Sequence, residues 1–363
     1  QVEQLNKTAL KSHGLDSNGQ LYKINSFEFY RYEDIIKKED DAGYDKTAFE
    51  KMLEIKGDSD HTKLIDMLTD LNDYSIGIED VLKEHFDEEN IVYWMAFQIL
   101  MGNVDTQNRN VYLYSPLNSD IWYFIAWDND GCLMRPEYEL RNFSDQNSWE
   151  KGISNYWGNI LFQRCLKSRS FREKLNDAIL NLREYLNKDM LTSKIESYKN
   201  VLKPYLYLMP DAEYEPLTSE QYDQIAASLP DEIEKNYQLY LESLETPMPF
   251  YIGVPTIDGD KLKFNWDVSY DLDAEDITYS VEVARDYLFQ DVIYQNTTLT
   301  VPESEMELPN AGQYFVRVRA TNTSGKTQDA FDYYVTDEGK HYGMRCFYIT
   351  EDSTVEEDDY EEG

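Results

Sequence analysis

Apolar positions follow different spacings in the two parts of the chain. Over residues 1–246 they recur mostly every three or four residues, as on helices, with a few strand-like runs. Over residues 247–350 they alternate in short runs, as on half-buried strands. Pro247 and Pro249 end the preceding helix and separate the two patterns. The sequence therefore predicts a multi-domain chain, with a mostly α (α+β) domain first and an all-β sandwich after it.

The most informative stretch of the first domain begins at Asp87. This residue is a suitable helix N-cap, and the apolar run after it predicts a buried helix that ends near Gly102. The polar residues that follow predict a loop, and residues 111–114 and 121–127 predict two strands joined by a turn. The second strand leads into the acidic turn 128–131. The predicted order is buried helix, polar loop, short hairpin and acidic turn.

Residues 159–245 predict a helical subdomain. Pro204 and Pro210 are expected to interrupt its helices. Met and Tyr residues on its apolar stripes are expected to belong to the core rather than to bind a cofactor. The stripes include Leu161, Leu166, Phe171, Leu175, Ile179, Leu182, Ile195, Tyr198, Val201 and Leu202.

Three segments of the second domain alternate as strands with one buried face do, namely 261–266, 277–283 and 313–322. Turn sequences that contain glycine lie between the strands. A tryptophan early in the domain (Trp266) and a tyrosine late in it (Tyr314) are typical of a β-sandwich.

Composition narrows the classes of function. Hydrophobic residues make up 41% of the chain, as expected for a folded protein, whereas residues 351–363 hold eight acids and no base and predict a disordered acidic tail. The net charge of −36 argues against nucleic-acid binding and favours basic protein partners or metal cations. Three scattered cysteines do not suit a disulfide framework or a zinc site, so a metal site would use oxygen ligands. No stretch approaches the roughly 18 apolar residues of a membrane span.

Candidate chemistry lies in the loop and the acidic turn. Asp105 and Asn110 are five residues apart, and Asp128 follows eighteen residues later, where the hairpin returns. Protein kinases use this order, in which one Asp accepts the substrate hydroxyl proton while an Asn and a later Asp hold Mg²⁺. The alternative is that Asp105 and Asn110 only form turns, and that Asp128 and Asp130 bind Ca²⁺ or water.

Two motifs resemble those of the CotH kinase family, which contains bacterial spore-coat-type kinases. Residues 103–114 are similar to its D…N-Y-x-L-Y motif, and residues 122–130 to its W-x-x-I-P-W-D-x-D motif. The resemblance covers residues 1–245 and implies a kinase-like C-terminal lobe that transfers the ATP γ-phosphate to Ser or Thr of a protein. It also implies roles for Asp105 as catalytic base, for Asn110 and Asp128 as ligands of Mg²⁺ or Mn²⁺, and for Asp130 as a further ligand.

The chain also departs from the family pattern. The family's N-terminal lobe is expected before Leu21, and residues 1–60 hold no Gly-rich loop and no obvious ATP-holding lysine. Lys23 is the nearest candidate by position, and the residues that would contact ATP stay unknown. Ala126 replaces the usual Pro, and residues 131–134 differ from the usual ending. We expect an active kinase in a longer parent protein, of which this truncated chain alone binds ATP poorly.

The second domain has a resemblance of its own. Residues 312–325 resemble the fibronectin type III signature, and Trp266 matches the core tryptophan of that family. The resemblance implies a spacer or binding module without catalytic residues. Such a module and the acidic tail suggest an extracellular, cell-surface or spore-coat location in a bacterium.

Two alternatives to an active kinase fit the same residues. The first is a catalytically degenerate pseudokinase that acts as a cell-surface or spore-coat scaffold. The second is a carbohydrate-active hydrolase that uses Asp105 and Asp128 as acid and base, at a carboxyl separation of about 5–10 Å. For the kinase, the acidic surface suits a Lys/Arg-rich protein substrate.

Overall fold

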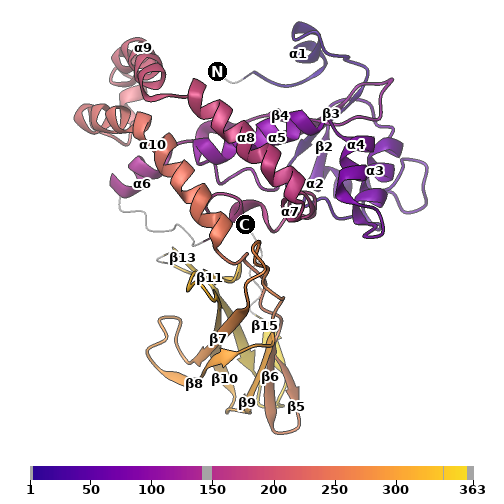
Figure 1. The fold of residues 1–363 in the computed structure, drawn as a ribbon, viewed down its shortest axis with the longest axis vertical. Helices are drawn as coiled ribbons and strands as arrows, with labels where there is room; N and C mark the ends of the chain where they lie inside the picture. Colours follow the sequence, from indigo (N-terminus) through magenta and orange to yellow (C-terminus); the bar gives the residue numbers. More distant parts are fainter. Residues whose placement is uncertain (1–2, 141–148, 338, 358–363) are drawn as a thin grey trace. The chain divides into compact units, whose positions relative to one another are not determined.

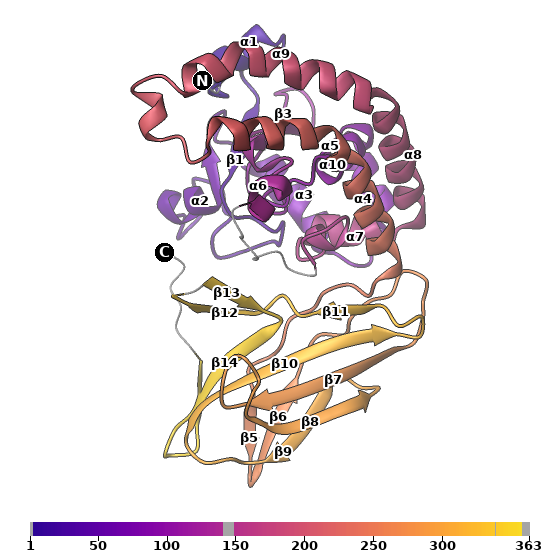
Figure 2. The same cartoon turned by 90° about the vertical axis from the view of Figure 1, so that its left-hand side faces the viewer.

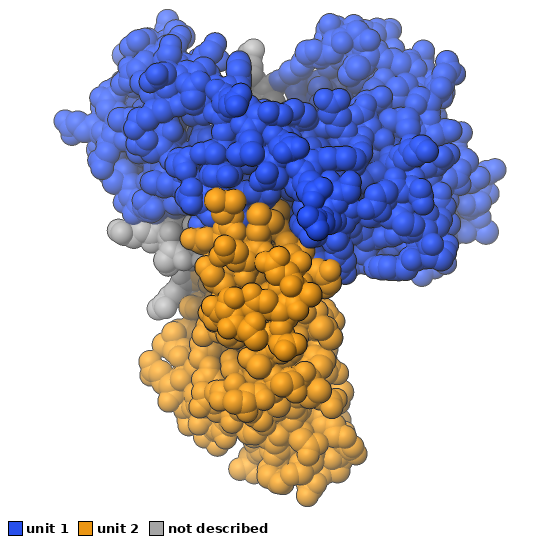
Figure 3. Space-filling view, viewed as in Figure 1, with its two compact units in different colours: residues 1–143, 156–240 blue, residues 144–155, 241–363 orange. Residues whose placement is uncertain are grey.

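The computed structural model describes residues 3–140, 149–337 and 339–357, and the chain divides into two compact units (Figure 3). Unit 1 comprises residues 1–143 and 156–240, and unit 2 comprises residues 144–155 and 241–363. Unit 1 is mostly helical, and unit 2 consists mostly of strands (Figure 1). The predicted order, a helical part followed by a strand-rich part, is therefore confirmed.

The helices of unit 1 surround one small sheet. This sheet has the order β2-β1-β3-β4 and is antiparallel throughout. Its strands are β1 (Gln20–Ile24), β2 (Leu53–Ile55), β3 (Val111–Ser115) and β4 (Tyr123–Ala126). The helices are α1 (Lys7–Ser12), α2 (Lys46–Met52), α3 (Thr62–Asn72), α4 (Ile78–His85), α5 (Glu88–Met101), α6 (Arg135–Leu140), α7 (Ile160–Lys167), α8 (Arg169–Tyr185), α9 (Lys188–Leu206) and α10 (Ser219–Glu245).

Helix α5 forms as the sequence predicts. The Asp87 carboxylate accepts a hydrogen bond from the Asn90 N–H at 2.9 Å, which satisfies one backbone donor at the start of the helix. Gly102 ends the helix with φ 61°, the left-handed conformation that glycine adopts at low cost. Eight of the helix's residues are buried, and the helix packs against α8 and β4. It is therefore the central helix beneath the hairpin.

The β3–β4 hairpin sets which loop residues meet. Its register pairs Val111 with Ala126 and Tyr114 with Tyr123. Asn110 and Asp128 therefore leave the two strands at the same end of the hairpin. The second strand is shorter than predicted, because Trp122 bridges to Phe86 instead of to β3. At the other end Asp128 adopts φ 53°, a left-handed conformation that ends the extended run.

Helix α9 departs from the sequence prediction in two ways. Pro204 lies inside the helix, in its last turn, rather than interrupting it. The apolar residues Tyr198, Val201 and Leu202 are exposed (62%, 62% and 51%), so they are not core residues as expected. Helix α9 runs antiparallel to α10, since Lys203 contacts Asp223, and Lys188 near the start of α9 contacts Asp231 farther along α10 (Figure 2). The apolar stripe of α9 therefore faces solvent from Tyr198 onward, whereas Leu191 near the start of the helix is buried.

Unit 2 contains two antiparallel sheets whose apolar faces form one core. Trp266 lies in this core, 5.5 Å from the Tyr279 ring, as the early tryptophan predicted. One sheet has the order β5-β6-β9, the other has the order β15-β14-β10-β7-β8 with β11 beside β10, and β12 pairs with β13. The strands are β5 (Thr256–Asp258), β6 (Lys261–Asn265), β7 (Ile277–Ala284), β8 (Val292–Leu299), β9 (Glu303–Glu307), β10 (Gly312–Asn322), β11 (Thr327–Asp329), β12 (Tyr333–Thr336), β13 (Gly339–Tyr342), β14 (Met344–Ile349) and β15 (Val355–Glu357).

The acidic C-terminal segment is partly ordered, which corrects the prediction of disorder from residue 351 onward. Strand β15 pairs with β14, with Ile349 opposite Val355. Val355 packs against the core, and Glu357 pairs with Arg345 at 2.8 Å. These contacts offset the low hydrophobicity of the segment. Residues 358–363 lie outside the described residues.

No helix in the described part of the chain is long and apolar enough to cross a membrane.

Candidate active site

The loop between α5 and β3 brings the first two predicted site residues together. The Asn110 Nδ2 donates a hydrogen bond to Asp105 Oδ2 at 2.6 Å. The other oxygen of Asp105 pairs with Arg109 Nε at 2.6 Å, in a contact that is about half exposed. Asn110 has φ 57°, which is uncommon for a residue other than glycine and folds its side chain back over the loop. Both oxygens of Asp105 are thus oriented by neighbours in the same loop.

Buried polar side chains hold this loop in place. Asn108 Nδ2 donates to Glu28 Oε1 at 2.6 Å, and Asn159 Nδ2 donates to the Gln107 carbonyl at 2.9 Å. The hydroxyl groups of Thr106 and Tyr156 lie 3.2 Å apart. The partners come from two distant parts of unit 1, near residue 28 and at residues 156–159, so the loop conformation depends on the fold of unit 1.

The acidic turn begins where β4 ends. Asp128 adopts φ 53° and ψ 56°, and the short 3₁₀ helix Asn129–Gly131 follows it. Asp128 is half-buried and Asp130 is exposed. Within the described residues, no hydrogen bond or ion pair engages either carboxylate. Two carboxylates are therefore available at the end of the hairpin where Asn110 lies.

The acidic turn packs directly on the loop. A Cβ atom at Gly131 would lie 2.7 Å from Asn103 Oδ1 and 3.7 Å from Asp105 Cβ, so only glycine allows this approach. Asn129, in the same turn, accepts hydrogen bonds from Gln98 Nε2 at 3.1 Å and from Asn103 Nδ2 at 3.4 Å. The structure thus brings Asp105, Asn110 and the turn 128–131 to one place.

The donor types at this place fit a hard divalent cation. Because the Asn110 Nδ2 points at Asp105, the Oδ1 of the same amide is directed away from that carboxylate. One amide oxygen and one or two carboxylates are what a protein offers to Mg²⁺ when substrate phosphates complete the coordination. Among the described residues, no group of three or more His, Cys, Asp or Glu side chains is placed to hold a metal ion.

Cys132 follows the acidic turn but is not a nucleophile. Burial, reinforced by the nearby charge of Asp130, raises the pKa of its thiol to about 12, although a hydrogen bond with Asn103 acts in the opposite direction. The thiol stays protonated at neutral pH, and the thiolate is the reactive form.

Lys23 lies on strand β1, not in the loop or the turn. It pairs with Tyr112 on β3 and with Glu54 on β2. Directly paired residues of an antiparallel sheet project from the same face, so Lys23 shares a face with Tyr112, whose ring lies 5.3 Å from that of Trp127. The lysine is therefore near the residue that precedes Asp128.

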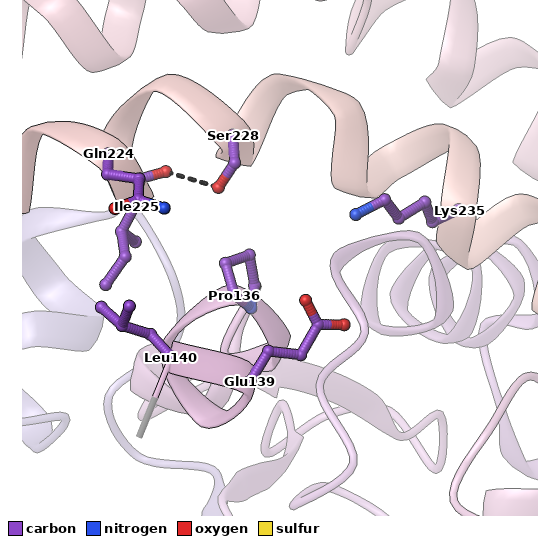
Figure 4. Close-up of a pocket in the computed structure, with 7 residues that line it drawn as sticks. All are labelled: Pro136, Glu139, Leu140, Gln224, Ile225, Ser228 and Lys235. Carbon is purple, nitrogen blue, oxygen red and sulfur yellow. Dashed lines mark hydrogen bonds between the residues drawn. The ribbon is translucent and has the colours of Figure 1, made fainter. Parts of the chain in front are cut away.

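A pocket of about 280 Å³ lies between α6 and α10 (Figure 4). Helix α6 begins five residues after Asp130. The pocket mixes chemical types, because it contains a carboxylate, an ammonium group, an amide, a hydroxyl and three apolar side chains. Its lining residues are Pro136, Glu139, Leu140, Gln224, Ile225, Ser228 and Lys235.

Sequence reasoning missed the residues that support the site. Gln98, Asn103 and Asn129 join the loop to the turn, and Glu28 and Asn159 hold the loop from outside. The positions of Asn103 and Asn129 inside the two motifs were a usable signal. Glu28 and Asn159 carry no local signal, because their role exists only after folding.

These features together define a protein-kinase-like domain: a central helix, a loop with an Asp–Asn pair, a hairpin, and an acidic turn folded onto that pair. A family model described as CotH kinase protein matches residues 1–240. The chain belongs to this family.

Other comparisons add little to this assignment. The search of curated proteins gives no match. Among solved structures, the twitchin kinase region from C. elegans is 16% identical, with 26% of this chain and 20% of that chain covered and a TM-score of 0.20. Domains 1–6 of the surface layer protein SbsC are 11% identical, with 91% of this chain and 41% of that chain covered and a TM-score of 0.16. Similarities this low do not extend the family assignment.

Proposed function

We propose that this chain carries the base and metal-binding half of a protein kinase that transfers the ATP γ-phosphate to a Ser or Thr hydroxyl. The observation that carries the proposal is the 2.6 Å hydrogen bond between Asn110 and Asp105, with the Asp128 turn packed beside it. This arrangement supports the proposal, because phosphoryl transfer requires one base close to several hard-oxygen ligands for a metal.

Each residue has a distinct role in the proposed reaction. Asp105 accepts the proton of the acceptor hydroxyl as the new O–P bond forms and the bond between the γ-phosphorus and the bridging oxygen breaks, releasing ADP. Asn110 and Asp128 hold Mg²⁺ or Mn²⁺ against the phosphates, and Asp130 is a further ligand. The metal supplies the positive charge that stabilises the phosphate oxygens.

The ion pair between Arg109 and Asp105 favours a second candidate, a pseudokinase that serves as a scaffold. A base whose two oxygens are both engaged is less ready to accept a proton. However, this pair is about half exposed, and exposed ion pairs contribute only about 0–1 kcal/mol. An arriving acceptor hydroxyl can displace it, so the active enzyme remains our first proposal.

The proposed acceptor is a Lys/Arg-rich region of a protein. The net charge of −36 supports attraction of a basic segment. In the pocket between α6 and α10, the exposed Glu139 carboxylate beside Pro136 and Leu140 suits a long basic side chain, whose aliphatic stem would cover the apolar residues. The ammonium group of Lys235 is already paired with Glu232 at 2.6 Å.

We also propose that unit 2 is a fibronectin type III module that acts as a spacer on an exported bacterial surface or spore-coat protein. Its strand order in two antiparallel sheets supports this assignment. So does the Tyr314 hydroxyl, which donates to the Asn310 carbonyl at 2.8 Å near the start of β10, the corner expected of such sandwiches.

Substitution of Asp128 tests the proposed reaction. In Asp128→Ala, we expect Mg²⁺- or Mn²⁺-dependent labelling of a basic acceptor protein by γ-labelled ATP to fall at least about 100-fold, because a metal ligand is lost. The assay is run with the full chain and, where the natural polypeptide is longer, with that polypeptide.

Asp120→Ala is the matched control, since Asp120 is an exposed Asp in the hairpin turn at the opposite end of β3 and β4. Its labelling should equal that of the wild type. Unchanged labelling in Asp128→Ala, with both variants folded by circular dichroism, contradicts the assignment.

A further inference from the structure

Three amide side chains form a closed ring of hydrogen bonds beneath the candidate site. Asn103 Nδ2 donates to Gln98 Oε1 at 3.0 Å, and Gln98 Nε2 donates to Asn129 Oδ1 at 3.1 Å. Asn103 Nδ2 also reaches Asn129 Oδ1 at 3.4 Å, which closes the ring. The three residues come from α5, from the loop after it and from the acidic turn.

Burial makes the geometry of this ring specific. Gln98 is 0% exposed and Asn103 is 2% exposed, so water cannot replace a lost partner easily. Buried amide groups without partners cost about 1–3 kcal/mol each, so Gln98 and Asn103 keep the orientations that satisfy each other, and their amides together orient the side chain of Asn129, which is itself exposed.

Through the backbone, the ring positions both Asp105 in the loop and the two carboxylates of the acidic turn. Asn103 Oδ1 accepts the backbone N–H of Asp105 at 3.3 Å. Asn129 stands between Asp128 and Asp130, so fixing its side chain fixes the backbone that carries both carboxylates. The close approach of Gly131 to Asn103 leaves no space for the turn to shift toward the loop.

We propose that Gln98, Asn103 and Asn129 are positioning residues that hold the base-bearing loop and the metal-binding turn at a fixed separation. The inference rests on the proposed function for its chemical consequence, but the mechanical coupling of the two segments does not depend on it. Gln98 is the residue to test, because it lies on a well-capped helix and a substitution removes its side-chain hydrogen bonds while keeping the bond from the Asn103 N–H to its backbone carbonyl at 3.0 Å.

The first measurement is steady-state phosphate transfer by Gln98→Met, which keeps the length of the side chain and removes its hydrogen bonds. We expect kcat to fall about 10- to 100-fold, as for residues that orient metal ligands, with the KM for ATP changed less than threefold. We also expect the Mg²⁺ concentration for half-maximal rate to rise about tenfold or more.

The second measurement is backbone hydrogen exchange in the protein without metal or nucleotide. In Gln98→Met, exchange should become about tenfold faster both in peptides covering 103–110 and in peptides covering 127–134, because the ring links these segments. Loosening of one segment alone, or of neither, overturns the proposed coupling.

Asn90→Ala is the matched control. Asn90 is another amide of α5 that bridges to a strand, with hydrogen bonds to the backbone of Phe124 at 2.7 and 3.1 Å, but it contacts neither the loop nor the turn. This variant should lose stability without the selective change in exchange and metal requirement.

The two proposals fail in different ways. If the wild type transfers phosphate and Gln98→Met keeps its kcat and metal requirement, the positioning role is overturned and the kinase assignment stands. If the wild type transfers no phosphate with any metal, the kinase assignment fails, and the exchange data alone then support or overturn the coupling.

Discussion

The two carboxylate oxygens of Asp105 contact two different neighbours, Arg109 and Asn110. Arg109 is an exposed partner that follows it by four residues, whereas Asn110 is a half-buried partner whose backbone is in the left-handed conformation. Non-glycine residues in this conformation cost about 1–3 kcal/mol and cluster at functional sites. Asn110 and Asp128, the residues proposed to hold the metal, both adopt it, although six other non-glycine residues in the described part of the chain also have positive φ.

Two substitutions distinguish the roles of Asn110 and Arg109 in phosphate transfer. Asn110→Ala should reduce phosphate transfer at least about 100-fold, because both a metal ligand and the orientation of the base are lost. Arg109→Ala should change it less than about fivefold, because an exposed ion pair contributes little. Parallel kinetic assays of the two variants measure this, and equal losses contradict the assigned roles.

Residues at the site differ in how far the sequence predicts them. The proximity of Asp105, Asn110 and Asp128 is predicted by their spacing around a hairpin, because a hairpin must return to its starting end, whereas their roles are implied only by the resemblance to the CotH kinase family. Glu28 and Asn159 are not predicted, because an acid and an amide at those positions look like any surface polar residue until the fold brings them to the loop. Local chemistry is visible in the sequence, whereas its long-range support is not.

At the scale of elements, helices α5 and α9 also differ in how far local residues predict their structure. The start and end of α5 follow from Asp87 and Gly102, which act within one turn of the helix. The apolar stripe of α9 has equally clear helical spacing, yet Tyr198 and Val201 are exposed. Periodicity predicts the helix in both cases, but burial depends on whether another element covers the stripe.

Gly102 offers a prediction at this scale. Gly102→Ala should lower the free energy of unfolding by about 1–3 kcal/mol, because φ 61° is unfavourable for alanine and its Cβ would lie 2.7 Å from the Asn236 side chain. Asn236 cannot move easily, since it donates to the Leu100 carbonyl at 2.9 Å and accepts from Arg135 at 2.7 Å.

The control for this prediction is Gly14→Ala. Gly14 has φ +71° but no atom within 4 Å of an added Cβ, so the variant has the backbone cost without the collision. Urea unfolding of both variants measures the difference. An equal or larger loss in Gly14→Ala would show that the contact with Asn236 is unimportant.

At the scale of the whole molecule, the family match and the compact units divide the chain at nearly the same residue. The match ends at residue 240, and unit 1 also ends there. Unit 2 nevertheless includes residues 144–155, between two segments of unit 1. The assignment of residues 144–155 to unit 2 is not predictable from the sequence, because such a short segment carries no pattern of its own.

Net charge leads to a prediction for the whole chain. With a charge of −36, self-repulsion opposes the compact state, and salt screens it. We expect Tm to rise between 0.05 and 0.5 M sodium chloride, by about 2–4 °C for each kcal/mol of repulsion removed. Differential scanning calorimetry measures this shift.

The control is the same series at pH 4.5, where many carboxylates are protonated and the salt effect should shrink. A Tm that falls with salt at neutral pH would mean that the surface ion pairs contribute more than the repulsion costs.

Strand β15 affects whether two copies of this protein can pair through the edge of a sheet when they are concentrated. An uncovered outer strand presents free backbone donors and acceptors that can template strand addition from another molecule. β15 lies along β14 and brings Glu356 and Glu357 to that border of the sheet, so an approaching strand meets carboxylates before it meets β14. The acidic segment thus places two carboxylates on the outer strand of this sheet, and such charges disfavour strand addition from a neighbouring molecule.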